Sequence, residues 1–455
     1  MPAEQSTRYK AVAIRACRVK RASCPGTPQL RDMSAEEHHR NSSRQVIAYC
    51  IVALFFCIDA VVVEVAEAEL VDKISVLDVK RRFIKTINKL SHIHSEFDYL
   101  YGLLNVTENL EDLYIALTDV NIRIWRLEEA IRKQEHQQDY DSLFMQRARL
   151  IYFNNDERGA LKRQINNLTS SRFIEEKYYR PYDFYHSNPS HAELLVVGHW
   201  GLGDLIGYSG LVRYLLLSNN YSKVNILVPK QYFESVQTLY DDVKSFIRVI
   251  AWHDNIQASK LSIETAYPEF NESNSLYFGF YENENFLRAM AANDVNQNFM
   301  KAFYRQCGIK PDACYSHFYL RRNLVRERVL YNSYIEQING KCYVIIHEDP
   351  SRNYFLNISK IPESHMSCHI IRVGRKGSPW SALENSTLDG LGSSNIFDYS
   401  MLIERATAFH GYDGAFLWLI EMLALNVDKY VHIYVRSLTN DTYIRELTSN
   451  WKIVE

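Results

Sequence analysis

The sequence predicts an α/β protein with two Rossmann-like halves, preceded by a transmembrane helix and a helical coiled-coil stem. Short apolar strands alternate with helical segments in two successive series, which indicates two parallel sheets with crossover helices. A heptad seam precedes these series, and an apolar run follows a basic N-terminus. With 455 residues, 47% of them hydrophobic, the chain is long enough to fill more than one core.

The N-terminal residues 1–45 form a basic tail, with nine Lys or Arg residues against four acids. The whole chain, in contrast, has a formal net charge of −2 and a pI near 6.7. This balance lacks the electrostatic footprint of a nucleic-acid-binding protein. We therefore expect no nucleic-acid partner and a tail that stays in the cytosol.

The next segment, residues 46–66, is predicted to cross a membrane. Its apolar part reads VIAYCIVALFFCIDAVVV, long enough for a hydrocarbon core of ~30 Å at ~1.5 Å per residue. Basic residues precede it and acids follow it, so the positive-inside rule predicts a type II signal anchor. A cleaved signal peptide, or a transit peptide over residues 1–31, remains the alternative.

Glycosylation sequons support a lumenal domain in the Golgi or endoplasmic reticulum. The pattern Asn-x-Ser/Thr occurs at Asn41, Asn105, Asn167, Asn220, Asn271, Asn357, Asn385 and Asn440. All but the first lie beyond the apolar segment, where a translocated chain is glycosylated.

Residues 67–180 are predicted to form a helical stem, followed by a linker at 181–192 that is rich in Tyr and Pro. Apolar residues step by three and four along the seam Leu110, Leu113, Leu117, Val120, Ile124, Leu127 and Ile131. This a/d pattern indicates a coiled coil, so we expect a homo-oligomer through the stem. A helical hairpin within one chain would show the same seam.

The two Rossmann-like halves are expected at 193–335 and at 336–455. Predicted strands cover residues 193–199, 223–229, 245–252, 341–349, 369–374 and 429–435. Predicted helices cover residues 205–218, 232–240, 397–409 and 416–425, with a helical connector at 294–339. Residues 253–293 show no clear period and receive no assignment.

The first strand runs into the sequence GHWGLGDL, where open α/β sheets bind ligands. Gly201 and Gly203 let the backbone approach a ligand, and His199 is expected to face the same cleft. Asp204 has two interpretations, because aspartate is both a candidate catalytic acid or base and a preferred helix N-cap.

The second half presents the sequence HEDPSRN at the corresponding place. His347, Ser351 and Arg352 follow a predicted strand, and a guanidinium there can hold a diphosphate through charge-assisted bonds. Further on, Asp413 and Gly414 fall at another helix N-terminus. The alternative is a plain polar turn at the first place and a helix cap at the second.

The cysteines and acids give no sign of a metal site. Four cysteines lie in the globular part, Cys307, Cys314, Cys342 and Cys368, and none has zinc spacing. Disulfides such as one between Cys307 and Cys314 would fit a lumenal domain. The D-x-D tripeptide at 139–141 lies in the predicted stem rather than at a strand end. We therefore expect no metal ion and no resident cofactor.

These motifs, in this order, resemble the heptosyltransferase-like (family 9) glycosyltransferases, which have the GT-B fold. The resemblance covers residues 192–455 and includes GLGD, NILVP, HEDPSRN, RVG at 372–374 and the passage from FDYSM to WLIEML. It implies that Asp204 is the general base. It implies nucleotide-sugar contacts at His347, Ser351, Arg352, Gly374, Asp413 and Gly414, and acceptor or cleft contacts at His199, Gly201 and Gly203.

The implied activity is inverting, metal-independent transfer of a sugar from a nucleotide-diphosphate sugar to a glycan or other hydroxyl acceptor. The turn at Asp413 and Gly414 departs from the family, where Ser usually flanks the Gly. This departure favours the alternative, a non-catalytic scaffold or binding protein with an inactive GT-B-like domain. A sugar-nucleotide hydrolase or epimerase is the other open class.

Overall fold

The structure, a computed structural model, describes the chain from Val63 to Val454 with gaps. Described are residues 63–174, 176–177, 182, 192–218, 221–252, 260–271, 273–279, 299–338, 341–348, 355–374, 395–433 and 447–454. The predicted basic tail lies outside these residues, as does the predicted membrane span except for residues 63–66. Among the described residues, no helix combines the length and apolarity needed to cross a bilayer.

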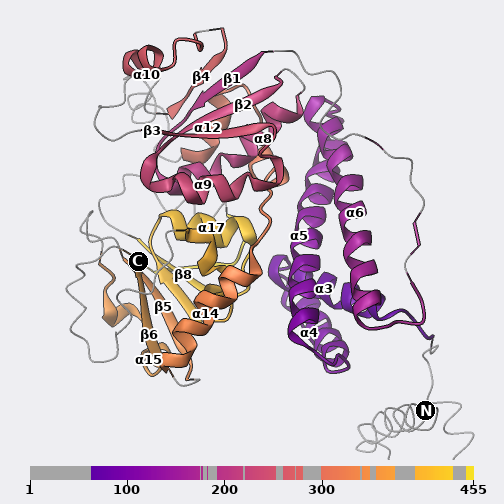
Figure 1. The fold of residues 1–455 in the computed structure, drawn as a ribbon. Helices are drawn as coiled ribbons and strands as arrows, with labels where there is room; N and C mark the ends of the chain where they lie inside the picture. Colours follow the sequence, from indigo (N-terminus) through magenta and orange to yellow (C-terminus); the bar gives the residue numbers. More distant parts are fainter. Residues whose placement is uncertain are drawn as a thin grey trace, which may run out of the picture. The chain divides into compact units, whose positions relative to one another are not determined.

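Four helices form a layer from the N-terminal part of the described chain (Figure 1). They are α3 (Glu67–Phe83), α4 (Ile87–Tyr101), α5 (Glu108–Gln137) and α6 (Ser142–Leu168). Thr107 caps α5 by accepting a hydrogen bond from the Leu110 amide, and Asp141 caps α6 by accepting one from the Phe144 amide. Gln138 takes the left-handed conformation that ends α5, so the chain reverses and α6 packs along α5.

Four of the seven residues of the predicted heptad seam are buried, and the other three are half-buried. Leu110, Leu117, Val120 and Leu127 are each at most 5% exposed. The first two pack with Ala68, Val71 and Ile165, which belong to α3 and α6. These contacts within one chain are those of the helical-hairpin alternative, and the homo-oligomer through the stem stays a prediction.

The first half contains a parallel four-stranded sheet in the order β3-β2-β1-β4. Its strands are β1 (Glu193–Val197), β2 (Lys223–Pro229), β3 (Ile247–Trp252) and β4 (Ser275–Tyr277). Its helices are α7 (Leu202–Gly207), α8 (Ser209–Leu217), α9 (Phe233–Leu239), α10 (Lys260–Ala266), α12 (Phe299–Gln306) and α13 (Ala313–Ser316), with single 3₁₀ turns at Lys230–Tyr232 and Asp241–Val243.

The helix predicted over 205–218 is divided in two. At Tyr208 the backbone has φ −89° and ψ 7°, which interrupts the helix. The buried Tyr208 ring packs edge-on against Phe278 and Phe303, with ring centroids 5.0 and 6.2 Å away. This packing fixes the bend.

The second half contains a parallel five-stranded sheet in the order β6-β5-β7-β8-β9. Its strands are β5 (Tyr343–Glu348), β6 (His369–Gly374), β7 (Ala408–Gly411), β8 (Asp428–His432) and β9 (Trp451–Val454). Its helices are α14 (Leu324–Ile338), α15 (Glu363–Met366), α16 (Ser400–Glu404) and α17 (Ala415–Leu423), with 3₁₀ segments at Ile358–Lys360 and Ile396–Tyr399. The helix predicted over 397–409 overruns, because Ala408 and Phe409 pair with β5 as strand β7.

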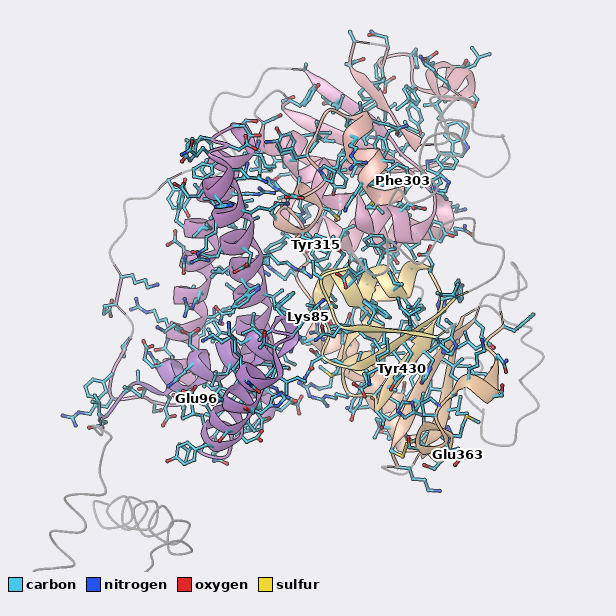
Figure 2. All side chains as sticks on the ribbon, turned by 180° about the vertical axis from the view of Figure 1, so that it is seen from behind. Lys85, Glu96, Phe303, Tyr315, Glu363 and Tyr430 are labelled. Atoms are coloured by element: carbon cyan, nitrogen blue, oxygen red, sulfur yellow. A yellow bond between two sulfur atoms is a disulfide. The ribbon has the colours of Figure 1, made fainter. Side chains whose placement is uncertain are left out.

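The helical layer contacts both halves, and Val65–Glu455 form one compact unit. Arg126 of α5 donates to the carbonyl oxygens of Met422 and Glu421 at the end of α17. Arg147 of α6 donates to the Ser316 hydroxyl. Tyr315 lies where the layer meets the halves, and its hydroxyl donates to the Glu421 carboxylate at 3.1 Å (Figure 2). The region predicted as a stem is thus a layer that covers the α/β part.

The disulfide expectation needs a correction. Cys307 and Cys314 do not form a disulfide, whereas Cys342 and Cys368 do. The latter two residues directly precede the neighbouring parallel strands β5 and β6, which brings their Cα atoms to 5.0 Å. Cys314 is instead buried in the main core, where its thiol donates to the Gly207 carbonyl and burial raises its pKa to about 12.

Candidate functional site

The carboxyl ends of β1 and β5 lie at the switch points of the two sheets. In the first sheet the order reverses between β1 and β4, and in the second between β5 and β7. Ligands of open α/β sheets bind outside the carboxyl ends of the strands at such points. The loop after β1 and the turn after β7 meet where α7 packs against α17, which lies between the two sheets in Figure 1.

Asp204 is hydrogen-bonded to His199 across the glycine loop. Its Oδ2 lies 2.8 Å from His199 Nδ1, and the two side chains are 19% and 35% exposed. Gly201 is the N-cap of α7, which makes Asp204 the third residue of the helix rather than its cap. A Cβ atom at Gly201 would collide with Asp204 Oδ2, so a glycine there allows the carboxylate to reach back to the imidazole. The cap interpretation of Asp204 is therefore not borne out.

Gly203 brings the two halves into close contact. A Cβ atom at this position would lie 3.3 Å from the backbone nitrogen of Ala415 and 3.0 Å from Trp418 Cδ1. Both neighbours belong to α17. A glycine is needed here because the first turn of α7 packs directly on the first turn of α17.

On the side of the second half, His347 lies at the carboxyl end of β5, in a group of aromatic rings. Its ring is stacked on Tyr412 with centroids 4.7 Å apart, and the Phe416 ring packs edge-on at the same distance. A Cβ atom at Gly414 would lie 3.4 Å from His347 Cε1. His347 is 7% exposed, so it packs beneath the turn at Gly414, while Asp413 is exposed on that turn.

A buried ion pair lies near the carboxyl ends of the neighbouring strands β5 and β6. Arg372 Nη1 donates to Glu348 Oε2 at 2.7 Å, and the other oxygen of Glu348 accepts from the Leu356 amide at 3.0 Å. Burial lowers the pKa of Arg372, against the opposing effect of Glu348. Gly374 is paired in register with Glu348 and ends β6 at the same edge.

The structure brings most of the predicted site residues together. His199, Gly201, Gly203 and Asp204 form the loop that meets α17, and His347, Asp413 and Gly414 surround the start of α17. Gly374 ends the strand beside His347. Ser351 and Arg352 lie outside the described residues.

Sequence reasoning missed the aromatic partners of the two histidines. Phe303 of α12 is stacked on His199 at 6.2 Å, and Tyr412 is stacked on His347. Tyr412 directly precedes the predicted site residue Asp413, so its position in the sequence could have marked it as a candidate. Nothing in the sequence linked Phe303 to a loop about a hundred residues earlier. Among the described residues, no group of three or more His, Cys, Asp or Glu residues is placed to hold a metal ion.

Comparison with known proteins gives one family match and several similar folds. Residues 61–194, which include α3 to α6, match a family of unknown function, DUF6165. No curated protein sequence matches the chain significantly.

Similar solved structures are glycosyltransferases of low sequence identity. The iron-containing dodecameric glycosyltransferase TibC of enterotoxigenic E. coli H10407 is 14% identical, with 54% of this chain and 59% of TibC covered at a TM-score of 0.34. A family 9 glycosyl transferase of Veillonella parvula DSM 2008 is 11% identical, covering 54% and 83% at 0.34. The E. coli heptosyltransferase WaaC is 10% identical, covering 58% and 93% at 0.29. The chain thus spans 59% of the length of TibC, and the α/β assignment rests on the strand orders described above.

Proposed function

We propose that the chain is a glycosyltransferase that moves a sugar from a nucleotide-diphosphate sugar to a hydroxyl group of a glycan or other acceptor. The observation that carries the proposal is the hydrogen-bonded pair of His199 and Asp204 at the end of β1, beside the N-terminus of α17. A carboxylate held in place by an imidazole at a switch point is suited to remove a proton from a bound hydroxyl group.

Asp204 is the proposed general base. His199 holds its Oδ2, while its Oδ1 forms no hydrogen bond with a described residue and can accept from an acceptor hydroxyl. As Oδ1 takes the proton, the acceptor oxygen attacks the anomeric carbon from the face opposite the leaving group. The bond from that carbon to the diphosphate breaks, and the nucleoside diphosphate leaves with the electron pair. Transfer therefore inverts the anomeric centre.

The donor diphosphate is proposed to bind at the turn that begins α17. The backbone amides at the start of this helix have no partners within the helix and favour an anion. Because α7 packs against Ala415, the diphosphate would approach from the side of Asp413 and Gly414. Asp413 and Gly414 form the turn. His347 is stacked on Tyr412, the residue directly before this turn. Arg352, which follows β5 in the sequence, would add positive charge. The proposed reaction uses no metal ion.

The decisive variant is Asp204→Asn, with Asp241→Asn as the matched control. Asp241 is 63% exposed in its side chain and lies far from β1 in sequence. The full chain is first screened for thermal stabilisation by nucleoside diphosphates and their sugars, and transfer is then measured with the best donor. We expect Asp204→Asn to lower transfer at least ~10²-fold with nucleotide binding retained, because a general base contributes about 10²- to 10⁴-fold. Unchanged transfer in this variant contradicts the proposal.

The screen also tests the second candidate, a non-catalytic binding protein, which the departure from the family at Asp413 and Gly414 favours. Absence of stabilisation by every nucleotide supports that candidate. Stabilisation followed only by donor hydrolysis supports a sugar-nucleotide hydrolase.

We keep the type II anchor at residues 46–66 as a proposal, with the Golgi or endoplasmic reticulum lumen as the location of the enzyme. The support is the apolar run between basic and acidic flanks and the sequons beyond it. Endoglycosidase treatment of the full chain expressed in cells tests it. A chain whose mobility does not change would contradict a lumenal location.

A further inference from the structure

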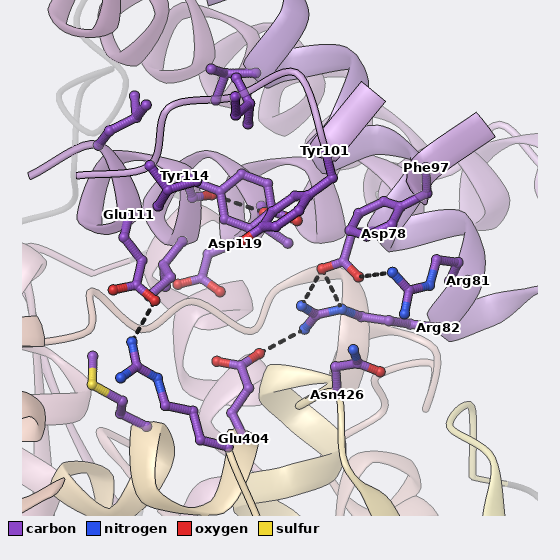
Figure 3. Close-up of a pocket in the computed structure, with 18 of the residues that line it drawn as sticks. Asp78, Arg81, Arg82, Phe97, Tyr101, Glu111, Tyr114, Asp119, Glu404 and Asn426 are labelled. Atoms are coloured by element: carbon purple, nitrogen blue, oxygen red, sulfur yellow. Dashed lines mark hydrogen bonds and ion pairs between the residues drawn. The ribbon is translucent and has the colours of Figure 1, made fainter. Parts of the chain in front are cut away.

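A cavity of about 220 Å³ lies between the helical layer and the second half. Its walls come from α3, α4 and α5 on one side and from α16 and the segment before α14 on the other (Figure 3). None of the residues assigned to the proposed active site lines it. Most of its wall belongs to the segment that matches the family of unknown function.

The charges around this cavity balance. Its lining includes four arginines and four carboxylates: Arg81, Arg82, Arg322, Arg405, Asp78, Glu111, Asp119 and Glu404. Arg82 pairs with Asp78 and Glu404, at 2.5 and 3.1 Å, and Arg405 pairs with Glu111 at 2.5 Å. Equal charge of both signs favours neither an anion nor a cation as the occupant.

Arg322 is satisfied by other acids as well. It is 2% exposed, donates to both oxygens of Glu327, and pairs with Glu404 at 3.0 Å. The guanidinium groups of Arg82 and Arg322 therefore have their hydrogen-bonding positions largely occupied by the protein. The cavity differs in this respect from a phosphate site, where arginine donors point at the ligand.

Among the four carboxylates that line the cavity, Asp119 is the one that these ion pairs leave without a close partner. Its side chain is 13% exposed and lines the cavity, its ion pair with Arg322 is long at 3.9 Å, and it forms no hydrogen bond with a described residue. Burial raises the pKa of Asp119 to about 7, against the opposing effect of Arg322. A carboxylate in this setting needs a hydrogen-bond donor, and a hydroxyl group of a ligand is a neutral one.

Aromatic rings form the outer wall of the same cavity. Phe97 and Tyr101 of α4 are stacked with centroids 5.4 Å apart, and Tyr101 meets Tyr114 edge-on at 6.3 Å. Tyr101 is 41% exposed, so its ring offers apolar area to a ligand. A ligand that covers these rings needs an apolar face as well as hydroxyl groups.

We propose that this cavity binds one neutral, polyhydroxylated ring of the size of a monosaccharide unit. The volume of about 220 Å³ lies below the ~300 Å³ at which pockets for drug-sized ligands begin. A sugar ring combines hydroxyl donors for Asp119 with an aliphatic face for Tyr101. This inference goes beyond the proposed function and stands without it.

Saturation-transfer NMR on the full chain tests the inference, with glucose, galactose, mannose and N-acetylglucosamine as probes. Glucuronate and glucosamine serve as the anionic and cationic counterparts. We expect at least one neutral sugar to bind and to bind more tightly than the charged analogues. Short oligosaccharides of the binding sugar show whether the source is a free monosaccharide or a unit of a chain.

Two variants locate the binding site. Asp119→Asn weakens a hydrogen bond to a charged acceptor, and Tyr101→Ala removes the ring. We expect Asp119→Asn to weaken binding about tenfold, since a hydrogen bond to a charged group contributes about that factor. Tyr101→Ala should weaken it by a similar factor, because the ligand loses the apolar area of the ring. Tyr99→Ala is the control, because Tyr99 lies on the same helix, is 60% exposed and does not line the cavity.

Several outcomes would overturn the inference. These are the absence of binding by all four neutral sugars, tighter binding of glucuronate or glucosamine, or unchanged affinity in both variants. No residue of α4 is buried, so the fold is expected to tolerate Tyr101→Ala, and thermal unfolding checks this. Nucleoside diphosphate binding is measured in parallel and should be unaltered in both variants, which separates this site from the proposed active site.

Discussion

Replacing Arg126 by Met should lower the stability of the whole described unit. Arg126 is 7% exposed on α5, and its guanidinium donates to the carbonyl oxygens of Met422 at 2.5 Å and Glu421 at 2.7 Å. These carbonyls belong to the last turn of α17, where carbonyl oxygens lack partners within the helix and carry negative partial charge. Arg126→Met keeps an apolar side chain of similar length and removes both bonds.

The magnitude follows from these two bonds and one opposing effect. Hydrogen bonds from a charged donor contribute ~1.5–3 kcal/mol each, so the pair contributes about 3–6 kcal/mol. Burial lowers the pKa of Arg126, so keeping the cation dehydrated carries a cost that Met does not have. We therefore expect a loss near the lower end, about 2–4 kcal/mol in the free energy of unfolding.

Urea unfolding followed by tryptophan fluorescence measures this loss, with Arg132→Met as the control. Arg132 lies on the same helix, is 66% exposed in its side chain and pairs only with Glu128 among the interactions described. An exposed pair of this kind contributes at most about 1 kcal/mol. If Arg126→Met unfolds at the same urea concentration as Arg132→Met, the layer is not held to α17 by these bonds.

Two further predictions concern buried charge and pH. Arg322→Met should cost about 3–5 kcal/mol, because Glu327, which is 1% exposed, would lose its cation. The double variant with Glu327→Leu should recover part of this loss, and urea unfolding that shows no recovery would contradict the pairing. His410 should make the fold sensitive to acid. Burial lowers its pKa from 6.5 to about 3, so the unfolded chain takes up this proton first. Stability is then full above pH 6.5 and falls towards pH 3 by up to about 1.4 kcal/mol per pH unit. Unfolding measured at pH 7, 6 and 5 should show a shallower decline in His410→Gln, and an equal slope would refute this source.

The strands that the sequence predicted well are those with continuous apolar runs between turn residues. The segments KVNILVP and HIIRVG form β2 and β6 with the predicted boundaries, although β2 lies inside its sheet and β6 at an edge. Strands β4, β7 and β9 were missed. Each has only three or four residues, so its apolar run is too short to predict a strand.

The position of Asp204 at a strand end followed from the sequence, but its partner did not. The bond to His199 spans five residues across a loop, and it depends on the conformation at Gly201 rather than on any helical or strand period. The helices that pack against the heptad seam could also not be predicted from the sequence. A heptad seam indicates that a helix has a partner without saying which chain or segment supplies it.

The contacts of α17 restrict movement of the two halves relative to each other. This helix of nine residues, about 13 Å long, meets the GLGD loop at its first turn and is bound by Arg82 and Arg126 at its last. The same layer also binds Ser316 of the first half through Arg147. Both halves are therefore bound to the helical layer. A hinge motion of one half relative to the other would have to break one of these two sets of contacts. Substitutions in α5 that loosen these contacts should therefore alter the packing of α7 on α17 from a distance.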